Sequence, residues 1–327
     1  MIVRELCFPA LAAASLLLMS AVQTANASEI YPVRPIRMVN PYTPGGTVDL
    51  VCRALSTRLS EVWGQQLIVD NRPGAGTNIG TEIVVRAQPD GYTLLCNTGT
   101  IATNPSFYPN LPFNPLKELT ALVLVVQTPN VLALNASVPL RSVRELIEFA
   151  RAKPGQLTFA SSGTGSSTHL ALELFKAMAN VDLTHVPYKG GGPVITDLAG
   201  GQVNGTFNPP SSVMPHVKSG RLRALAVSSA ARSEFAPDIP TVAESGVPGY
   251  EAIVWYAVFA PRALPARLVE KWNSEVNRQL QTPELRERFF TAGMSPMGGS
   301  AREADAYFAR ETARWGELIR TAKIAVQ

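Results

Sequence analysis

From Ile36 onward, short apolar runs alternate with longer segments in which apolar residues recur every three or four positions. The short runs predict strands, and the longer segments predict helices with one buried face. The segment 48–63 illustrates the helical spacing, because its large apolar residues fall on one side and its charged residues on the other. The residues of the apolar side are Leu50, Ala54, Leu55, Leu59 and Val62.

This alternation of strands and helices predicts an α/β fold built on parallel sheets. A turn-rich segment at 104–115 divides the predicted elements into two groups. Strands are predicted at 36–39, 67–69, 92–96, 122–126, 131–134, 157–161, 183–186, 203–207, 223–227 and 253–260. Helices are predicted at 48–63, 77–87, 143–151, 168–179, 194–198, 267–280, 284–291 and 302–322.

The chain has 327 residues, more than one hydrophobic core usually serves. Apolar residues make up 46% and charged residues 17%, a balance typical of a globular protein rather than a disordered one. We therefore expect two α/β lobes, each a mainly parallel sheet flanked by helices, with a ligand cleft between them. The predicted lobes are 28–102 together with 226–327, and 103–225.

Residues 1–27 have the features of a cleavable signal peptide. Arg4 precedes an apolar run, and the segment ends at 25–27 in the small-x-small pattern that signal peptidases recognise. The run is interrupted by Pro9 and is too short for a comfortable membrane span. Cys7 lies far upstream of the expected cleavage point, so no lipid anchor is predicted. We expect a free, exported protein in a periplasm.

Charge and cysteine content narrow the picture only slightly. The net charge of +4 is modest and the basic residues are dispersed, which argues against a nucleic-acid-binding surface. Beyond the signal peptide the cysteines are Cys52 and Cys96. One disulfide is possible in an oxidising compartment, but a chain of this size does not need one, and we favour two separate buried thiols.

The most informative segment is 41–49, called the first loop, which joins the first predicted strand to the first predicted helix. Gly45 and Gly46 allow a ligand to approach the backbone, and Thr47 is the expected N-cap. Unpaired amides and the positive end of the helix dipole favour an anion at such a helix start. The first loop is therefore predicted to bind a carboxylate or a phosphate.

A second strand-to-helix turn at 161–169, called the second loop, is rich in glycine and hydroxyl residues. In open α/β sheets ligands lie beyond the carboxyl ends of strands, so both loops should face the cleft and hold one ligand between them. The turns after the strands that end near 96 and 207 either supply polar contacts or are plain turns. The candidate ligand-binding residues are Tyr42, Thr43, Pro44, Gly45, Gly46, Thr47, Asp49, Asn97, Thr98, Ser161, Ser162, Gly163, Thr164, Gly165, Ser166, His169 and Asn208.

Several of these residues have an alternative, structural interpretation. Gly45 and Gly46 either let the backbone approach a ligand or only make a tight turn. Asp49 either complements the helix dipole or contacts the ligand, where it would meet an amino group, a hydroxyl group or a bridging water. Tyr42 either lines the cleft or lies in the core. His169 either contacts the ligand or hydrogen-bonds the loop, and the second role is favoured.

Catalytic and metal-binding interpretations have less support. Ser161, His169 and Asp49 are the residue types of a hydrolytic triad, but no G-x-S-x-G elbow surrounds any serine. The histidines His169, His185 and His216 have no carboxylate or thiol partners at ligand spacing, so no metal site is predicted. We expect no catalysis and no cofactor, and keep a periplasmic serine hydrolase as an alternative.

A series of short motifs resembles the periplasmic solute receptors of tripartite tricarboxylate transporters, often called Bug-type receptors. The resemblance spans essentially the whole chain after the signal peptide. The motifs are PGGTVD at 44–49, VDNRPGAG at 69–76, PDGYTLL at 89–95, SSGTG at 161–165, VPYKG at 186–190, PHVKSGRLRAL at 215–225 and PTVAESG at 240–246.

This resemblance implies a two-lobed periplasmic binding protein of type II that closes on a small organic acid and delivers it to a membrane permease. It also implies that backbone amides and ordered water in both loops hold one ligand carboxylate. That role falls on 42–47 and 162–166, with Asp49 and His169 beside them. The implied ligand is a mono-, di- or tricarboxylate, including amino and aromatic acids, and the receptor is expected to be a monomer. A receptor that signals to a membrane sensor kinase is a further alternative.

Overall fold

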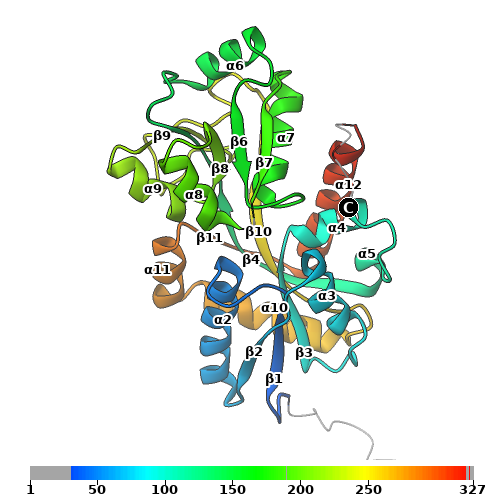
Figure 1. Cartoon of the computed structure of the whole chain (residues 1–327). Coiled ribbons are helices and arrows are strands. Elements are labelled where there is room, and N and C mark those ends of the chain that lie inside the picture. The colour runs from blue at the N-terminus through cyan, green and yellow to red at the C-terminus, as the bar shows by residue number, and fades with distance from the viewer. Residues whose placement is uncertain (1–30, 189, 322–323, 325–327) are drawn as a thin grey trace, which may run out of the picture. The chain divides into compact units, whose positions relative to one another are not determined.

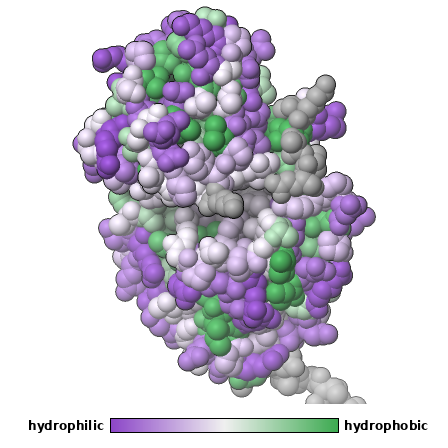
Figure 2. Space-filling model, in the orientation of Figure 1, coloured by the Kyte–Doolittle hydropathy of each residue, from purple (hydrophilic) through white to green (hydrophobic). Residues whose placement is uncertain are grey.

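The computed structural model describes residues 31–188, 190–321 and 324, so the predicted signal peptide lies outside the described residues. The chain divides into two compact units, Met1–Arg34 and Pro35–Gln327, and the described helices and strands all belong to the second unit. In the described part of the chain, no helix combines the length and the apolar character that crossing a membrane requires. On the face shown in Figure 2, hydrophilic residues surround separate groups of apolar ones.

Six strands form the first sheet, and helices cover both of its faces (Figure 1). In spatial order the strands are β11 (Ser295–Gly298), β4 (Leu119–Pro129), β10 (Ile253–Pro261), β3 (Thr93–Thr98), β1 (Ile36–Asn40) and β2 (Leu67–Asn71). The helices on this sheet are α2 (Thr47–Trp63), α3 (Asn78–Val85), α4 (Thr100–Phe107), α5 (Pro115–Glu118), α10 (Ala266–Leu280), α11 (Pro283–Thr291) and α12 (Ala301–Thr321), with a 3₁₀ turn η1 (Ala75–Thr77) before α3.

Five strands form the second sheet, which also has helices on both faces (Figure 1). In spatial order the strands are β7 (Thr184–Pro187), β6 (Thr158–Ser161), β8 (Gly205–Asn208), β5 (Val131–Asn135) and β9 (Leu222–Val227). One apolar cluster joins the sheet to α6 (Val143–Ala152) and α7 (Ser167–Ala179), and another joins it to α8 (Gly191–Ala199) and α9 (Pro210–Lys218).

The predicted α/β fold is confirmed, but both sheets are mixed rather than mainly parallel. β1 pairs in parallel with β2 and β3, and β6 pairs in parallel with β7 and β8. The other pairings, which involve β4, β5, β9, β10 and β11, are antiparallel. Parallel neighbours need a crossover connection, usually a helix. The strand β4 instead leads directly into the second sheet, and β10 returns from that sheet, so these two strands run in opposite directions and pair antiparallel.

Strand pairing shows where the chain first crosses from one sheet to the other, and this position is later in the sequence than we predicted. β4 pairs with β10 in the first sheet, and the chain enters the second sheet after Asn130. This favours a crossing at Asn130 over the predicted one at 102/103. The return occurs between Val227 and Ile253, and Ser228 ties it to the outward passage. The Asn130 amide donates to Ser228 Oγ at 2.7 Å, and the Ser228 amide donates to the Asn130 carbonyl at 2.8 Å.

The helix after the first loop shows how the sequence sets the local structure. Ala54, Leu55 and Leu59 are buried as the three-and-four spacing predicts, whereas Val62 is 40% exposed. The helix ends at Gly64, whose left-handed conformation (φ 63°) lets its amide donate to the Ser60 carbonyl. The buried face of α2 packs on the first sheet, which fixes the position of the helix start.

Four elements were not predicted, namely α4, α5, α9 and β11. Proline explains two of these omissions, because Pro105 and Pro215 lie inside α4 and α9 and their sequences therefore resemble turns. The loops that matter for binding follow parallel strands. β1 ends at Asn40 and leads into the first loop, and β6 ends at Ser161 and leads into the second.

Gly205 of β8 provides a test of core packing in the second sheet. A Cβ at this position would lie 2.5 Å from Phe159 Cζ and 2.8 Å from Leu134 Cδ2, too close for real atoms. We expect Gly205→Ala to lower the free energy of unfolding by about 1–3 kcal/mol, measured by urea denaturation. In the control Gly200→Ala, the added Cβ would lie 3.4 Å from its nearest neighbour, and we expect a change within about 0.5 kcal/mol. Equal unfolding midpoints for both variants would contradict this packing.

Candidate functional site

The first loop presents an uncapped helix start. Gly46 is the N-cap residue of α2, in an extended conformation (φ −81°, ψ 177°), and no side chain caps the helix. The prediction that Thr47 is the N-cap was wrong by one residue, because Thr47 is already helical and its side chain hydrogen-bonds Tyr256. The crest of the loop is exposed, so the first amides of α2 are open to an anionic group.

Asp49 turns its carboxylate into the protein and holds the first loop. Its Oδ1 accepts from the side-chain amides of Asn40 (3.2 Å) and Asn71 (3.0 Å). Its Oδ2 accepts from the Gly45 amide (3.1 Å) and from Arg53 Nε (2.8 Å). The residue is 4% exposed. Burial favours the neutral acid, but the hydrogen bonds from Arg53, Asn71 and Gly45 outweigh it and lower the pKa of Asp49 to about 2.

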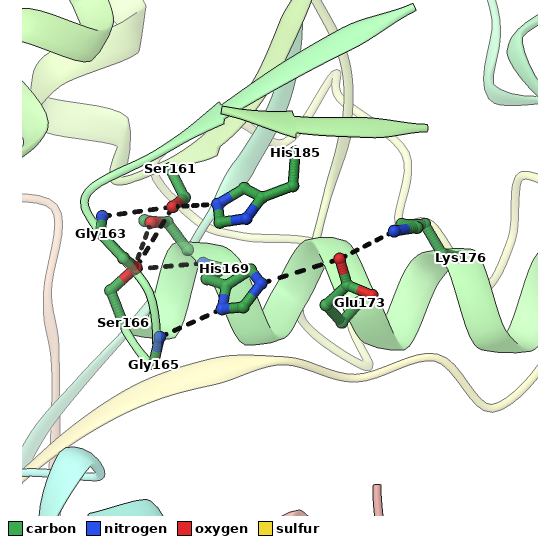
Figure 3. A network of polar contacts seen from close by, with 9 residues as sticks. Ser161, Gly163, Gly165, Ser166, His169, Glu173, Lys176 and His185 are labelled. Atoms are coloured by element: carbon green, nitrogen blue, oxygen red, sulfur yellow. Dashed lines mark hydrogen bonds and ion pairs between the residues drawn. The ribbon is translucent and has the colours of Figure 1, made fainter. Parts of the chain in front are cut away.

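The second loop has a similar bond from a glycine amide to a side chain, but here a side chain also caps the helix. The Gly165 amide donates to Nδ1 of His169 at 3.1 Å (Figure 3). Ser166 is the N-cap of α7, and its Oγ accepts from the His169 amide at 3.3 Å while donating to the Gly163 carbonyl at 2.6 Å. Ser162 is tied to the same turn, because its amide donates to Thr168 Oγ1 at 2.8 Å.

The two loops therefore share one hydrogen-bonding pattern. In each, a glycine of positive φ (85° at Gly45, 78° at Gly165) donates its amide to a side chain four residues later. The accepting side chain is Asp49 in the first loop and His169 in the second, and both are 4% exposed. The helix starts differ in one respect, because no side chain caps α2, whereas in α7 the His169 amide donates to Ser166 Oγ and the Ser166 amide donates to the Gly163 carbonyl at 3.1 Å.

A stacked pair of histidines lies beneath the second loop. The rings of His169 and His185 are 3.9 Å apart between centroids, with an angle of 15° between their planes. His185 Nε2 is 2.6 Å from Ser161 Oγ, and His169 Nε2 is 3.7 Å from Glu173 Oε1, which in turn pairs with Lys176 at 2.9 Å (Figure 3). Because Nδ1 of His169 accepts a hydrogen bond, its proton belongs on Nε2.

Both histidines are held neutral. Burial, the neighbouring His185 and Lys176 lower the pKa of His169 to about 3. Burial and Lys176 lower the pKa of His185 to about 4. The second loop therefore carries no imidazolium charge near neutral pH, and its hydrogen bond from Gly165 to His169 does not depend on protonation there.

The remaining candidate residues lie either in the two loops or on the strands β3 and β8 that end near them. Tyr42 is part of the first loop, and its hydroxyl hydrogen-bonds Thr98 (2.8 Å) and Thr100 (3.1 Å). Asn97 points into the core and donates to Thr81 Oγ1 at 3.3 Å. Asn208 lies at the second loop, because its side chain and that of Ser162 both approach Gly191. A Cβ on Gly191 would lie 3.3 Å from Asn208 Oδ1 and 3.6 Å from Ser162 Oγ. Thr43, Pro44, Gly45 and Gly46 form the exposed crest of the first loop, and Ser162, Gly163, Thr164, Gly165 and Ser166 are half-buried.

Sequence reasoning missed the residues that support the loops. The ion pair between Asp49 and Arg53 could be predicted from the sequence, because side chains four residues apart on a helix are neighbours. Asn40, Asn71 and His185 are not readable in this way, since they come from separate strands and meet the loops only in the folded chain.

Two buried thiols lie under the first loop. Cys52 and Cys96 are free, as predicted. Burial, and after it a hydrogen bond with Cys96, raises the pKa of the Cys52 thiol. Burial likewise raises the pKa of the Tyr42 hydroxyl. The Cys52 thiol and the Tyr42 hydroxyl are therefore uncharged near neutral pH.

The geometry does not favour catalysis or metal binding at these loops. Ser161 is fully buried, and its Oγ also contacts the backbone of Gly163. The Asp49 carboxylate accepts hydrogen bonds from Asn40, Gly45, Arg53 and Asn71, and none of these contacts is the aspartate–histidine pair that a hydrolytic triad needs. In the described part of the chain, no three or more His, Cys, Asp or Glu side chains are grouped to hold a metal ion.

Two mixed α/β sheets with matching loops at the ends of parallel strands define a two-lobed ligand-binding protein of the periplasmic type. The sequence model of the tripartite tricarboxylate transporter family receptor (TctC) matches residues 51–324. The chain belongs to this family of solute receptors.

Individual relatives support this assignment. BugT of Bordetella pertussis is 36% identical over 295 residues, covering 90% of each chain. The structure of Rpa4515 of R. palustris with adipate has a TM-score of 0.81 and 38% identity, covering 91% of this chain and all of that one. MatC of Rhodopseudomonas palustris with bound malate has a TM-score of 0.77 and 28% identity, covering 88% of this chain and 100% of that chain.

Asp49→Asn tests the charged acceptor in the first loop. The pKa of Asp49 is about 2 in the folded chain, against an ordinary value of 3.8. Its stabilising effect is therefore complete above pH 4 and is lost as the pH falls toward 2. We expect the variant to lose about 1–3 kcal/mol in urea unfolding at pH 5, and less at pH 3.

The matched control for this change is Glu61→Gln, which removes an exposed ion pair with Arg58 (2.7 Å) and should cost less than about 1 kcal/mol. An equal loss for Asp49→Asn at both pH values would show that its charge is not what holds the loop.

The histidine pair predicts a second pH dependence. The folded pKa values of His169 and His185, about 3 and 4, lie below the ordinary value of 6.5, so the unfolded chain binds more protons between pH 6.5 and 4. Stability should fall by at least about 1 kcal/mol from pH 7 to pH 5. In the double variant His169→Asn, His185→Gln this slope should flatten, whereas Gly200→Ala keeps it. An unchanged slope in the double variant would refute the assignment.

Proposed function

We propose that this chain is an extracytoplasmic solute receptor that binds a small organic carboxylate between the first and second loops. It delivers the ligand to a tripartite tricarboxylate-type membrane transporter and carries out no catalysis itself. The observation that carries this proposal is the repeated loop construction. In each loop one glycine amide donates to a side chain of the same loop. This bond holds the start of the following helix, and its remaining amides, in a fixed position.

A carboxylate is the anion that best suits these loops. It accepts several hydrogen bonds from fixed backbone amides, and such charge-assisted bonds are stronger than neutral ones. The helix dipoles of α2 and α7 both favour negative charge at this position. Ordered water can complete the coordination at little cost. The relatives crystallised with adipate and with malate both hold organic acids, which supports this ligand class.

The proposed contacts follow from the loop geometry. The ligand carboxylate meets the amides of Gly46 and Thr47 in the first loop and the amides of Ser167 and Thr168 at the start of α7. Asp49 and His169 hold the loops and act on the ligand only through them. The other candidate residues of the two loops, with Thr98 and Asn208, line the same site. The lobes meet at this site and enclose the ligand.

Cellular location and partners are part of the same proposal. The sequence at 1–27 is proposed to direct export to the periplasm and to be removed there. The receptor is then a soluble monomer whose partners are the organic acid and the permease subunits of the transporter. Family membership supports the transporter, because the matching family model describes a receptor of that system.

A serine hydrolase is the second candidate, and one contact favours it. Ser161 Oγ and His185 Nε2 are 2.6 Å apart, a distance suited to proton transfer between a nucleophile and its base. Against it, Ser161 is fully buried and out of reach of a substrate. Product formation from ester or amide substrates that is lost in Ser161→Ala would establish the hydrolase.

Gly46→Val tests the receptor proposal directly. A Cβ at Gly46 has only the Thr43 carbonyl near it, at 3.9 Å, so the fold tolerates the change while the side chain covers the helix start. We expect calorimetry against a panel of mono-, di- and tricarboxylates to show binding by the wild type and at least about a 100-fold loss in the variant, because a blocked site loses several hydrogen bonds together.

Gly200→Ala, which adds a Cβ away from both loops, should bind like the wild type. Unchanged affinity in Gly46→Val would place the ligand elsewhere, and no binding across the panel would contradict the receptor function.

A further inference from the structure

A small cavity lies between the start of α4 and the second loop. Its volume is about 20 Å³, and it is bounded by β10 and α12 as well. A buried site needs roughly 10–15 Å³ to admit a water molecule, so this cavity has room for a single oxygen atom. The polar or small residues that line it are Gly99, Thr100, Thr103, Gly165, Ser167 and Trp255.

Trp255 lines this cavity and carries an unpaired donor. The residue is 1% exposed, and its indole N–H has no hydrogen-bond partner among the described residues. Its ring is fixed by edge contacts with Tyr307 (5.5 Å between centroids) and Phe308 (6.4 Å). An indole N–H donates and cannot accept, and burying one without a partner costs about 1–3 kcal/mol. The site therefore requires an acceptor atom.

The start of α4 is shaped to leave this donor open. Gly99 is its N-cap residue, and no side chain caps the helix. A Cβ on Gly99 would lie 2.9 Å from Trp255 Nε1, so glycine is needed for the indole edge to approach the helix start. The helix amides add positive potential to the same point.

The cavity adjoins the second loop directly and is linked to the first loop through Thr100. Thr100 lines it and also accepts a hydrogen bond from the Tyr42 hydroxyl of the first loop at 3.1 Å. Gly165 and Ser167 line it from the second loop and the first turn of α7. An atom in the cavity is therefore next to the place where a ligand held by both loops would lie.

The chemistry of the lining selects the kind of atom. Among the described residues around the cavity there is no lysine, arginine or histidine, and most of the other walls are apolar, from Leu170, Ile253, Val254 and Trp315. A second carboxylate of the ligand would lose its hydration in this cavity without gaining a cationic partner, so a charged group is disfavoured here. A hydroxyl or carbonyl oxygen needs only the single donor that Trp255 supplies.

We propose that this cavity is a subsite for one uncharged acceptor oxygen of the ligand, and that Trp255 is the specificity-determining residue. The inference rests on the proposed carboxylate receptor function and narrows its ligands to hydroxy or oxo acids. In ligands without that oxygen, a water molecule fills the cavity.

The test compares carboxylates that differ by one oxygen, such as succinate with malate and butanoate with 3-hydroxybutanoate. By calorimetry, the wild-type protein should bind the oxygen-bearing member of at least one pair about 3- to 10-fold more tightly, as one buried hydrogen bond predicts. In Trp255→Phe, which keeps an aromatic ring, this preference should fall to near 1, while affinity for the other member changes less than about twofold.

A matched variant and a spectroscopic measurement guard against a general loss of structure. Trp272→Phe alters another buried tryptophan, one that packs against Trp63 at 4.6 Å, and should keep the preference. The chain has 4 tryptophans, so its ¹H–¹⁵N spectrum has one indole cross-peak for each, and the peak missing in Trp255→Phe identifies Trp255. That peak should move downfield with the oxygen-bearing ligand and stay in place with its partner.

Two outcomes would overturn the subsite while leaving the receptor function intact. One is equal wild-type affinity within every pair, and the other is an unchanged preference in Trp255→Phe. If that variant does not fold, the variants Trp63→Phe, Trp272→Phe and Trp315→Phe assign the other three indole peaks and leave that of Trp255 by elimination. A Trp255 peak of the wild type that does not move with the oxygen-bearing ligand then overturns the proposal equally. If no carboxylate binds at all, the receptor function fails and the subsite fails with it.

Discussion

The architecture of the candidate site depends on one hydrogen bond, made once in each loop. A glycine amide just before a helix donates to a side chain on the first turn of that helix, Asp49 in one case and His169 in the other. This bond fixes a turn of positive φ, which glycine adopts without strain. Without it the turn would have many conformations, and ordering it on binding would offset part of the ligand's interaction energy.

The two loops reach the same geometry with opposite electrostatics. Asp49 is charged, Arg53 balances its charge, and two side-chain amides donate to the carboxylate. His169 is neutral, and the Glu173 carboxylate near its Nε2 pairs with Lys176. In both cases the acceptor is saturated, so neither side chain presents an unbalanced charge to an incoming anion. This resolves the apparent conflict of an acidic residue in an anion-binding loop, because the carboxylate faces the loop that it holds.

Sequence patterns predicted most of the fold because its strands and helices have clear periodicities and glycine turns between them. They failed at α4 and α9, where prolines inside helices imitate turns, and at β4, whose apolar run does not reveal which sheet it joins. In the candidate site, the loops and their glycines were readable. Their supports were not, since Asn71, His185 and Trp255 reach the site from distant strands. An unpaired indole N–H is a property of packing, and no local pattern encodes it.

Recognition through backbone amides has a consequence for divergence within the family. Every residue type except proline carries the same amide, so side chains around the helix starts can change without altering the donors, provided that the glycine turn and its acceptor persist. In the proposed receptor, the part that binds the common feature of the ligands is thus insulated from mutation, and new ligand preferences can evolve at neighbouring side chains without changes to the backbone donors.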